Sequence, residues 1–124
     1  MSLRTPLGRV RGLGSAKEGT HHWWMQRVTA VALVPLSLWF IVSLIRLSGA
    51  DHAAAVAWLA SPVTAVFMLL TIIGVFHHLQ LGLQVVIEDY IHNEAMKVAC
   101  VLGVKLASFA LAVAAGFAVL KVAF

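Results

Sequence analysis

Three long stretches of the chain carry almost no charge, and this feature restricts the fold more than any other. Residues 28–45 and 52–87 contain no Asp, Glu, Lys or Arg, and residues 98–120 contain only Lys105. A water-soluble helix needs a polar face, which these stretches lack. Each is long enough to cross the hydrocarbon core of a bilayer, which takes about 20 apolar residues. The sequence therefore predicts an all-α membrane protein with three transmembrane helices.

The apolar stretches set the expected boundaries of one small domain. The 124 residues suffice for a single membrane-anchor domain, covering 1–124. We expect a basic tail followed by three spans, at about 1–26, 27–45, 62–87 and 98–121. A polar linker and an Ala-rich stretch separate the first two spans, and a compact polar loop at 88–97 separates the last two. Pro35 is expected to bend the first helix, and Ser61 suits the N-cap before Pro62.

The basic residues predict the orientation. Five of the nine Lys and Arg residues precede the first apolar run, namely Arg4, Arg9, Arg11, Lys17 and Arg27. Cytoplasmic segments of membrane proteins carry an excess of such residues. The N-terminus and the 88–97 loop are therefore predicted to be cytoplasmic, and the C-terminus periplasmic. The basic residues are not interleaved with aromatic side chains in a patch, which argues against nucleic acid as a partner.

Two adjacent histidines, His77 and His78, lie inside the second predicted span. An ionisable residue inside a membrane helix is a candidate functional residue. Gly74, His78 and Gly82 are four residues apart and so share one helix face. Glycines on either side of a histidine leave room for a flat porphyrin whose iron takes the imidazole, a common haem ligand. The alternative is that both glycines serve close helix packing, with a neutral, hydrogen-bonded histidine.

The depth of His78 agrees with a haem in the membrane. It lies ten residues before Glu88, about 15 Å along a helix, near the middle of a core of about 30 Å. Adjacent histidines cannot bind one iron from opposite sides, and the others lie at or outside the interfaces: His21, His22, His52 and His92. A bis-histidine haem would need its second ligand from another chain. Arg27, at the start of the first span, is expected near the haem carboxylates.

Asp89 and Tyr90 end the second predicted span, directly after Glu88. A tyrosine hydroxyl can donate a hydrogen bond to a quinone carbonyl, and a carboxylate beside it can accept protons. The alternative is that Tyr90 anchors the helix at the membrane interface, where tyrosine is common.

Two motifs resemble the hydrophobic membrane anchor family of bacterial succinate dehydrogenase, the D subunit of complex II. One is the run His78-Leu-Gln-Leu-Gly82 followed by Asp89-Tyr90, which matches the pattern H-x-x-x-G with D-Y eleven residues after the histidine. The other runs from Gly19-Thr-His21 to Arg27-Val-Thr-Ala30. Chain length and three-span topology agree, so the likeness covers nearly the whole chain.

The resemblance implies a role for each of these candidate residues. His78 would be an axial ligand of haem b, paired with a histidine of the cytochrome b subunit, although the doubled histidine leaves His77 open as the ligand. Tyr90 and Asp89 would belong to the quinone site, and Arg27 and His21 would lie near the haem propionates or the quinone. The substrate would be ubiquinone or menaquinone. Partner flavoprotein and iron–sulfur subunits would carry the succinate site, and the complex would lie in the bacterial inner membrane.

Three alternatives stay open at this point. The same anchor could serve a fumarate reductase, because a sequence does not set redox potentials. A small transport subunit could use His77 and His78 as a proton relay, although the spans contain no acidic partner. A purely structural assembly protein would hold both histidines packed and inert.

Overall fold

The computed structural model describes residues 5–12, 14 and 18–124, and these residues are helical apart from short connections. The helices are α1 (Pro6–Val10), α2 (Gly19–Leu47), α3 (His52–Leu59), α4 (Pro62–Tyr90) and α5 (Glu94–Ala123). α2, α4 and α5 are long and apolar enough to cross a membrane, which confirms the prediction of three candidate spans. At 1.5 Å per residue each is about 44 Å long, longer than a hydrocarbon core of about 30 Å.

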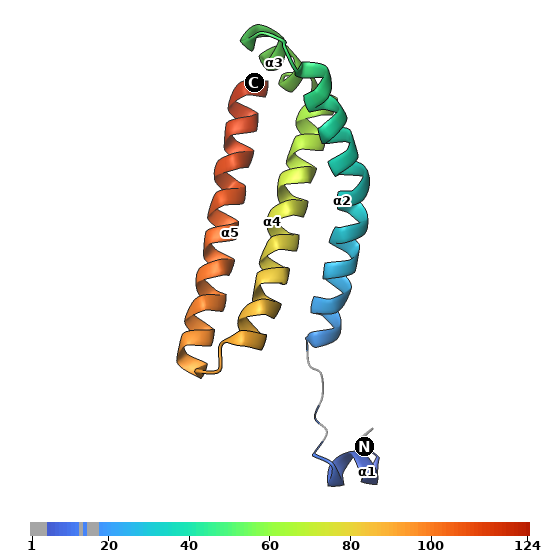
Figure 1. The fold of residues 1–124 in the computed structure, drawn as a ribbon, viewed down its shortest axis with the longest axis vertical. Helices are drawn as coiled ribbons and strands as arrows, with labels where there is room; N and C mark the ends of the chain where they lie inside the picture. The colour runs from blue at the N-terminus through green and yellow to red at the C-terminus, as the bar shows by residue number, and fades with distance from the viewer. Residues whose placement is uncertain (1–4, 13, 15–17) are drawn as a thin grey trace.

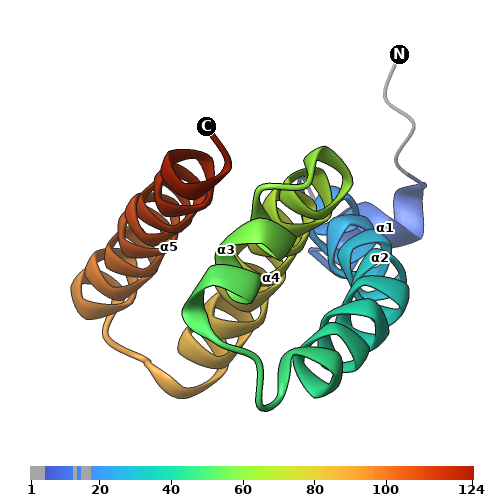
Figure 2. The same cartoon turned by 90° about the horizontal axis from the view of Figure 1, so that it is seen from above.

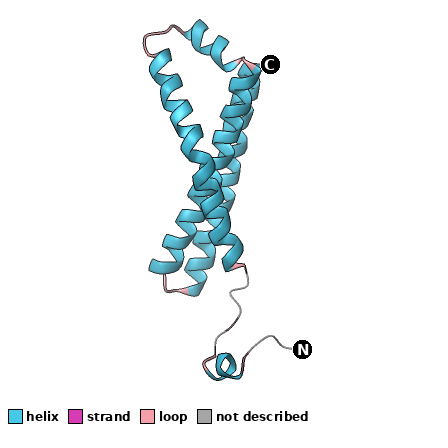
Figure 3. Cartoon of the chain, turned by 90° about the vertical axis from the view of Figure 1, so that its right-hand side faces the viewer, coloured by secondary structure: helices cyan, strands magenta, loops and turns pink. Residues whose placement is uncertain are grey.

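The central helix of the fold is α4. α2 and α5 pack against α4, and the three long helices form an open row, clear in the view from above (Figure 2). Seen from the side, α2 crosses the α4–α5 pair (Figure 3). The short α3 packs against α4 and α5 across one end of the row. Because α4 has a neighbour on each side, its residues are the ones best placed to form a site.

The two ends of the row are built from different parts of the chain (Figure 1). The start of α2 and the α4–α5 connection share one end, and α3 and the C-terminus share the other. This is the arrangement expected of three successive crossings. The cytoplasmic N-terminus and periplasmic C-terminus remain predictions that rest on the basic residues.

The helices extend beyond the predicted spans. α2 begins at Gly19, so the last eight residues of the predicted tail are helical. No proline interrupts this stretch, and Trp23, Trp24 and Met25 continue the apolar run. The tail also contains α1, where the Thr5 side chain accepts from Gly8 N at 3.0 Å and Pro6 occupies the first turn. Two of its basic residues, Arg4 and Lys17, lie outside the described residues.

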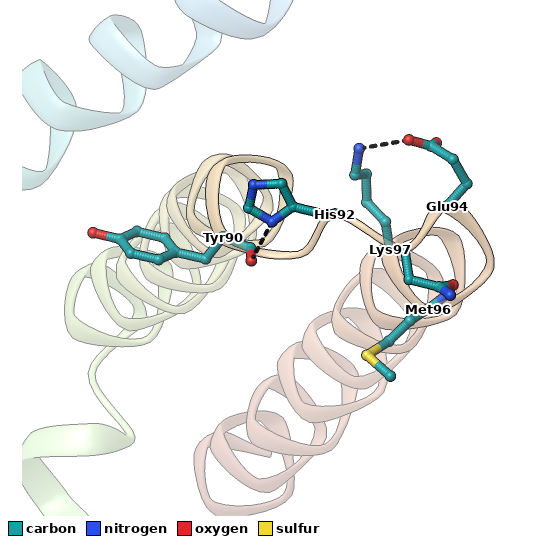
Figure 4. A network of polar contacts seen from close by, with 6 residues as sticks. Tyr90, His92, Glu94, Met96 and Lys97 are labelled. Atoms are coloured by element: carbon teal, nitrogen blue, oxygen red, sulfur yellow. Dashed lines mark hydrogen bonds and ion pairs between the residues drawn. The ribbon is translucent and has the colours of Figure 1, made fainter.

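The connection between α4 and α5 is shorter than the predicted 88–97 loop. α4 continues through Tyr90, and α5 starts at Glu94 because Asn93 Oδ1 accepts a hydrogen bond from Met96 N at 3.0 Å. Glu94 and Lys97 form an ion pair of 2.9 Å within the first turn of α5 (Figure 4). The polar residues predicted as loop are therefore mostly helix ends.

Of the two predicted helix signals, the N-cap position of Ser61 is confirmed, and the bend at Pro35 stays a prediction. Ser61 occupies the N-cap position of α4 before Pro62, but its side chain makes no capping hydrogen bond. Pro35 lies inside α2, which runs as one element from Gly19 to Leu47.

The Ala-rich stretch after the polar linker folds as α3, where Asp51 Oδ1 accepts from Ala54 N at 2.8 Å. Alanine's high helix propensity and this cap explain why the stretch is helical.

Few side chains are buried within the described residues. The buried ones are small or medium in size: Thr29, Ser43, Thr64, Ala65, Leu81, Ser108 and Val119. Small residues let helices approach closely, which is how membrane helices pack. Most large apolar side chains are exposed on the row of helices. Lipid or partner helices must cover these faces in the membrane.

Candidate functional site

One face of α2 packs against the glycine–histidine face of α4. A Cβ added at Gly74 would lie 3.0 Å from Leu33 Cδ2, and a Cβ added at Gly82 would lie 3.6 Å from Gln26 Nε2. Between these two contacts, Thr29 Oγ1 lies 3.0 Å from His78 Nδ1. Side chains of α2 therefore cover both glycines within this chain, as the packing interpretation expects. A porphyrin would have to reach His78 from beside the α2–α4 contact.

The His78–Thr29 contact is held in place from the α2 side. Thr29 is only 8% exposed, and its hydroxyl lies 2.8 Å from Met25 O and 3.2 Å from Gln26 O. His78 itself is half-buried, about 18 Å from the Tyr90 end of α4. Among the described residues, Nδ1 is the His78 ring nitrogen with a hydrogen-bond partner, and Nε2 has none. Within the described residues, the imidazole thus has one ring nitrogen without a partner.

His77 faces a different part of the molecule. It lines an apolar groove between α4 and α5, with a volume of about 610 Å³, together with Phe76, Lys105 and Phe109. It also borders a more polar hollow of about 390 Å³ near the start of α2. The two adjacent histidines therefore face different neighbours, His78 toward α2 and His77 toward α5. Which of the two histidines could bind an iron therefore depends on the side from which a partner chain would approach.

A series of hydrogen-bonded polar side chains runs along α4 from Gln80 toward the Tyr90 end, a polar ladder that ends at Glu88. Gln80 Nε2 donates to Gln84 Oε1 at 3.2 Å, and Gln84 Nε2 donates to Glu88 Oε1 at 2.8 Å. His21 of α2 and Glu18, the N-cap residue before α2, border the same hollow as this ladder. The hydrogen bonds satisfy amide groups that would be costly to leave unpaired in lipid.

The metal-binding side chains near the middle of α4 suit one axial ligand of a haem iron, which the porphyrin already holds, and not a bare metal ion. Among the described residues, no group of three or more His, Cys, Asp and Glu side chains could hold a bare metal ion. A haem iron needs only one or two axial ligands from protein, and a neutral imidazole is a common one. His78 meets this need, because Nδ1 is hydrogen-bonded to a neighbouring helix and Nε2 is unpartnered within the described part of the chain.

The predicted quinone residues lie at the exposed end of α4. Tyr90 is 79% exposed, and its ring points away from His92 and Lys97 (Figure 4). The neighbouring His92 ring donates from Nδ1 to the backbone carbonyl of Tyr90 at 3.1 Å, since a carbonyl can only accept. Asp89 is exposed as well. Within the described part of the chain, both the phenol and the carboxylate are therefore accessible to a ligand.

The recorded contact of the Arg27 side chain is made within α2. The guanidinium of Arg27 stacks over the Trp23 ring at 5.3 Å, and both side chains are exposed. Arg27 comes two residues before Thr29, which puts it about 200° around α2 from the side that meets His78. No hydrogen bond or ion pair joins Arg27, His21, Asp89 or Tyr90 to one another in the described structure. A common pocket for them would need walls from other chains.

Sequence reasoning missed the polar side of α2 that faces α4. His22, Gln26 and Thr29 are spaced by four and three residues, and Leu33 follows four later. Such spacing is typical of a helix-packing seam, and polar residues in this pattern were the available signal. Two atoms of this seam, His22 Nε2 and Gln26 Oε1, are buried without a hydrogen-bond partner within the described residues.

The sequence also matches known proteins over most of its length. Residues 1–112 match the family described as "Succinate dehydrogenase/Fumarate reductase transmembrane subunit". The succinate dehydrogenase hydrophobic membrane anchor subunit of Rickettsia bellii is 36% identical over 106 residues, 86% of this chain and 85% of the relative. The subunit of the same name from Paracoccus denitrificans is 34% identical over 105 residues, 84% of this chain and 81% of the relative. This chain belongs to the family of succinate dehydrogenase and fumarate reductase transmembrane subunits.

Proposed function

We propose that this chain is the membrane anchor subunit of a succinate:quinone oxidoreductase, and that His78 gives one axial ligand to a shared haem b. The anchor role is supported by the family match, by relatives with that name and by three helices able to span a membrane. The dehydrogenase chemistry belongs to flavoprotein and iron–sulfur subunits. The complex lies in a bacterial inner membrane, with the N-terminus of this chain in the cytoplasm.

The single observation that carries the haem role is the environment of His78. Its imidazole is half-buried in a membrane helix, is hydrogen-bonded through Nδ1 and has no Nε2 partner in the described structure. An unused imidazole nitrogen in lipid is costly, so a ligand for Nε2 is expected. The described histidines other than His77 lie near the helix ends, so a histidine of the cytochrome b subunit would complete the ligand pair. When bound, a haem b supplies one-electron transfer at this depth.

The quinone role is assigned to Tyr90 with Asp89 beside it. The Tyr90 hydroxyl would donate a hydrogen bond to a carbonyl of ubiquinone or menaquinone, and Asp89 would orient groups or accept protons at the same end of α4. Both side chains are exposed in this chain, so the remaining walls of the pocket belong to partner subunits. Arg27 and His21 are assigned to the vicinity of the propionates or the quinone on the same assembled surface.

The experiment that tests the haem role compares two adjacent histidines in the purified four-subunit complex. His78→Ala is expected to lower the haem content, or to change the reduced-minus-oxidised spectrum so that it is no longer that of a bis-histidine b-type haem. His77→Ala is the matched control, because it removes the same side chain from the side that faces α5. It is expected to keep a near-normal spectrum.

Two results would contradict this assignment. If the two substitutions exchange their effects, His77 is the ligand and the α4–α5 side faces the haem. If neither variant changes the haem spectrum while both assemble, this chain gives no ligand and serves as an anchor alone. The direction of catalysis is measured on the same preparation, with succinate oxidation and fumarate reduction compared at matched quinone concentrations.

A further inference from the structure

The hydrogen bonds around Thr29 fix the position of one proton on His78. The Thr29 hydroxyl has a single hydrogen, and two of its three neighbours are the backbone carbonyl oxygens of Met25 and Gln26, at 2.8 Å and 3.2 Å. A carbonyl oxygen can only accept, so the hydroxyl hydrogen points toward these carbonyls. This back-bonding to the preceding turn is a usual arrangement for a threonine within a helix.

The third contact of the hydroxyl must then use an oxygen lone pair. His78 Nδ1 lies 3.0 Å from Thr29 Oγ1, so this nitrogen must carry the hydrogen and donate it. In a neutral imidazole the other nitrogen, Nε2, then has a free lone pair. The contact with α2 thus selects the tautomer that can bind a metal through Nε2, and turns Nε2 away from α2.

We propose that Thr29 is the positioning residue of the haem ligand, setting both the tautomer and the ring orientation of His78. The proposal rests on the proposed role of His78 and deepens it. Thr29 does not touch the iron and acts only through the imidazole. Metal-binding histidines generally donate their second ring N–H to a fixed acceptor, which makes the bound nitrogen more basic.

The side chain of Thr29 is suited to this task. It is buried between two helices, and its hydroxyl is anchored to its own backbone, so the acceptor has one position. A β-branched side chain has restricted rotation about its first bond in a helix. The acceptor is therefore ordered before the subunits assemble, and little rotational freedom is lost when the ligand bond forms.

The test compares two threonines in the purified complex. Thr29→Val keeps the shape of the side chain and removes the hydroxyl that accepts from His78. Thr71→Val is the matched control, because the Thr71 hydroxyl also donates to its own helix, at 2.7 Å from Phe67 O, but forms no hydrogen bond with a histidine in the described structure. Thr29→Ser retains the acceptor and serves as the conservative variant. The readouts are haem per complex, the electron paramagnetic resonance spectrum of the oxidised haem, and its midpoint potential.

Thr29→Val is expected to weaken haem retention about 10- to 100-fold, the usual effect of losing a partner of a metal-binding histidine. The largest g-value is expected to move, because the imidazole plane is no longer fixed. The midpoint potential is expected to rise, because a less basic imidazole stabilises the ferric state less. Thr29→Ser is expected to restore the wild-type values, and Thr71→Val to leave all three readouts unchanged.

The outcomes separate this inference from the haem role itself. If Thr29→Val keeps the wild-type spectrum and potential while His78→Ala loses the signal, Thr29 has no positioning role and His78 remains the ligand. If His78→Ala keeps the signal, the haem role itself is overturned. Should Thr29→Val prevent assembly, Thr29→Ala removes the hydroxyl without adding a methyl group against His78. A wild-type g-value and potential in that variant would also overturn the inference.

Discussion

The backbone of Gly74 lies against the side chain of Leu33, so closely that a Cβ added at Gly74 would be 3.0 Å from Leu33 Cδ2. One turn further along α4, His78 meets Thr29, and one turn beyond that, Gly82 meets Gln26. The absence of a side chain at Gly74 lets α2 approach α4 closely one turn from the histidine contact, whereas a Cβ at Gly82 would make only an ordinary contact, 3.6 Å from Gln26 Nε2. The orientation of His78 therefore depends on how closely α2 packs on α4.

Gly74→Leu is expected to force α2 away from α4. A leucine at this position would overlap Leu33, and overpacking of this kind typically costs about 1–3 kcal/mol. The expected result is a lower midpoint of thermal unfolding for the purified complex, with a weaker haem signal because Thr29 moves with α2. Gly103→Leu is the control, since nothing lies within 4 Å of a Cβ added at Gly103. Equal stability of the two variants would contradict the close α2–α4 contact.

Tyr90→Phe is expected to lower quinone reduction and to leave assembly and haem intact. The substitution keeps the ring and removes only the hydroxyl of a side chain that is 79% exposed. Leaving the quinone carbonyl unpaired costs on the order of 1–3 kcal/mol, or about a 10- to 100-fold slower quinone step. Succinate oxidation with an artificial acceptor that bypasses the quinone is the control and should keep its rate. Wild-type quinone reduction in this variant would leave Tyr90 as an interfacial anchor only.

The orientation in the membrane is tested with reporter fusions at the two ends of the chain. A reporter after Phe124 is expected to behave as periplasmic and one before Met1 as cytoplasmic, because the basic residues gather before the first span. Alkaline phosphatase and a fluorescent protein that folds only in the cytoplasm give opposite signals in the two positions. A cytoplasmic C-terminus would contradict the predicted orientation.

Asn93→Ala is expected to destabilise the start of α5. Asn93 Oδ1 accepts from Met96 N, and losing such a cap costs about 0.5–2 kcal/mol. The measurement is the thermal midpoint of the purified complex, together with proteolysis at the α4–α5 connection. Asn93→Gly is the matched variant, because glycine at an N-cap costs only a few tenths of a kcal/mol. Identical behaviour of the two variants would show that tertiary contacts, and not the cap, hold this end of α5.

Charge and length in the sequence determined the number of spans and their approximate positions. Stretches with almost no charge cannot form soluble helices of that length, so 28–45, 52–87 and 98–120 could be interpreted without a structure. The pair His77–His78 also stood out, since ionisable residues are rare in such helices. The family followed from motifs around His78 and Tyr90, and the match over residues 1–112 agrees with it.

Only the tertiary structure decided which faces of the helices meet. In a soluble helix the apolar side marks the packed face, but in a membrane helix lipid and protein both meet apolar side chains, so the pattern does not distinguish them. For this reason the sequence did not decide whether Gly74 and Gly82 make room for a porphyrin or for a neighbouring helix. It also gave no reason to pair Thr29 with His78. Their contact depends on how α2 crosses α4, which places two residues 49 positions apart in the chain within 3.0 Å of each other.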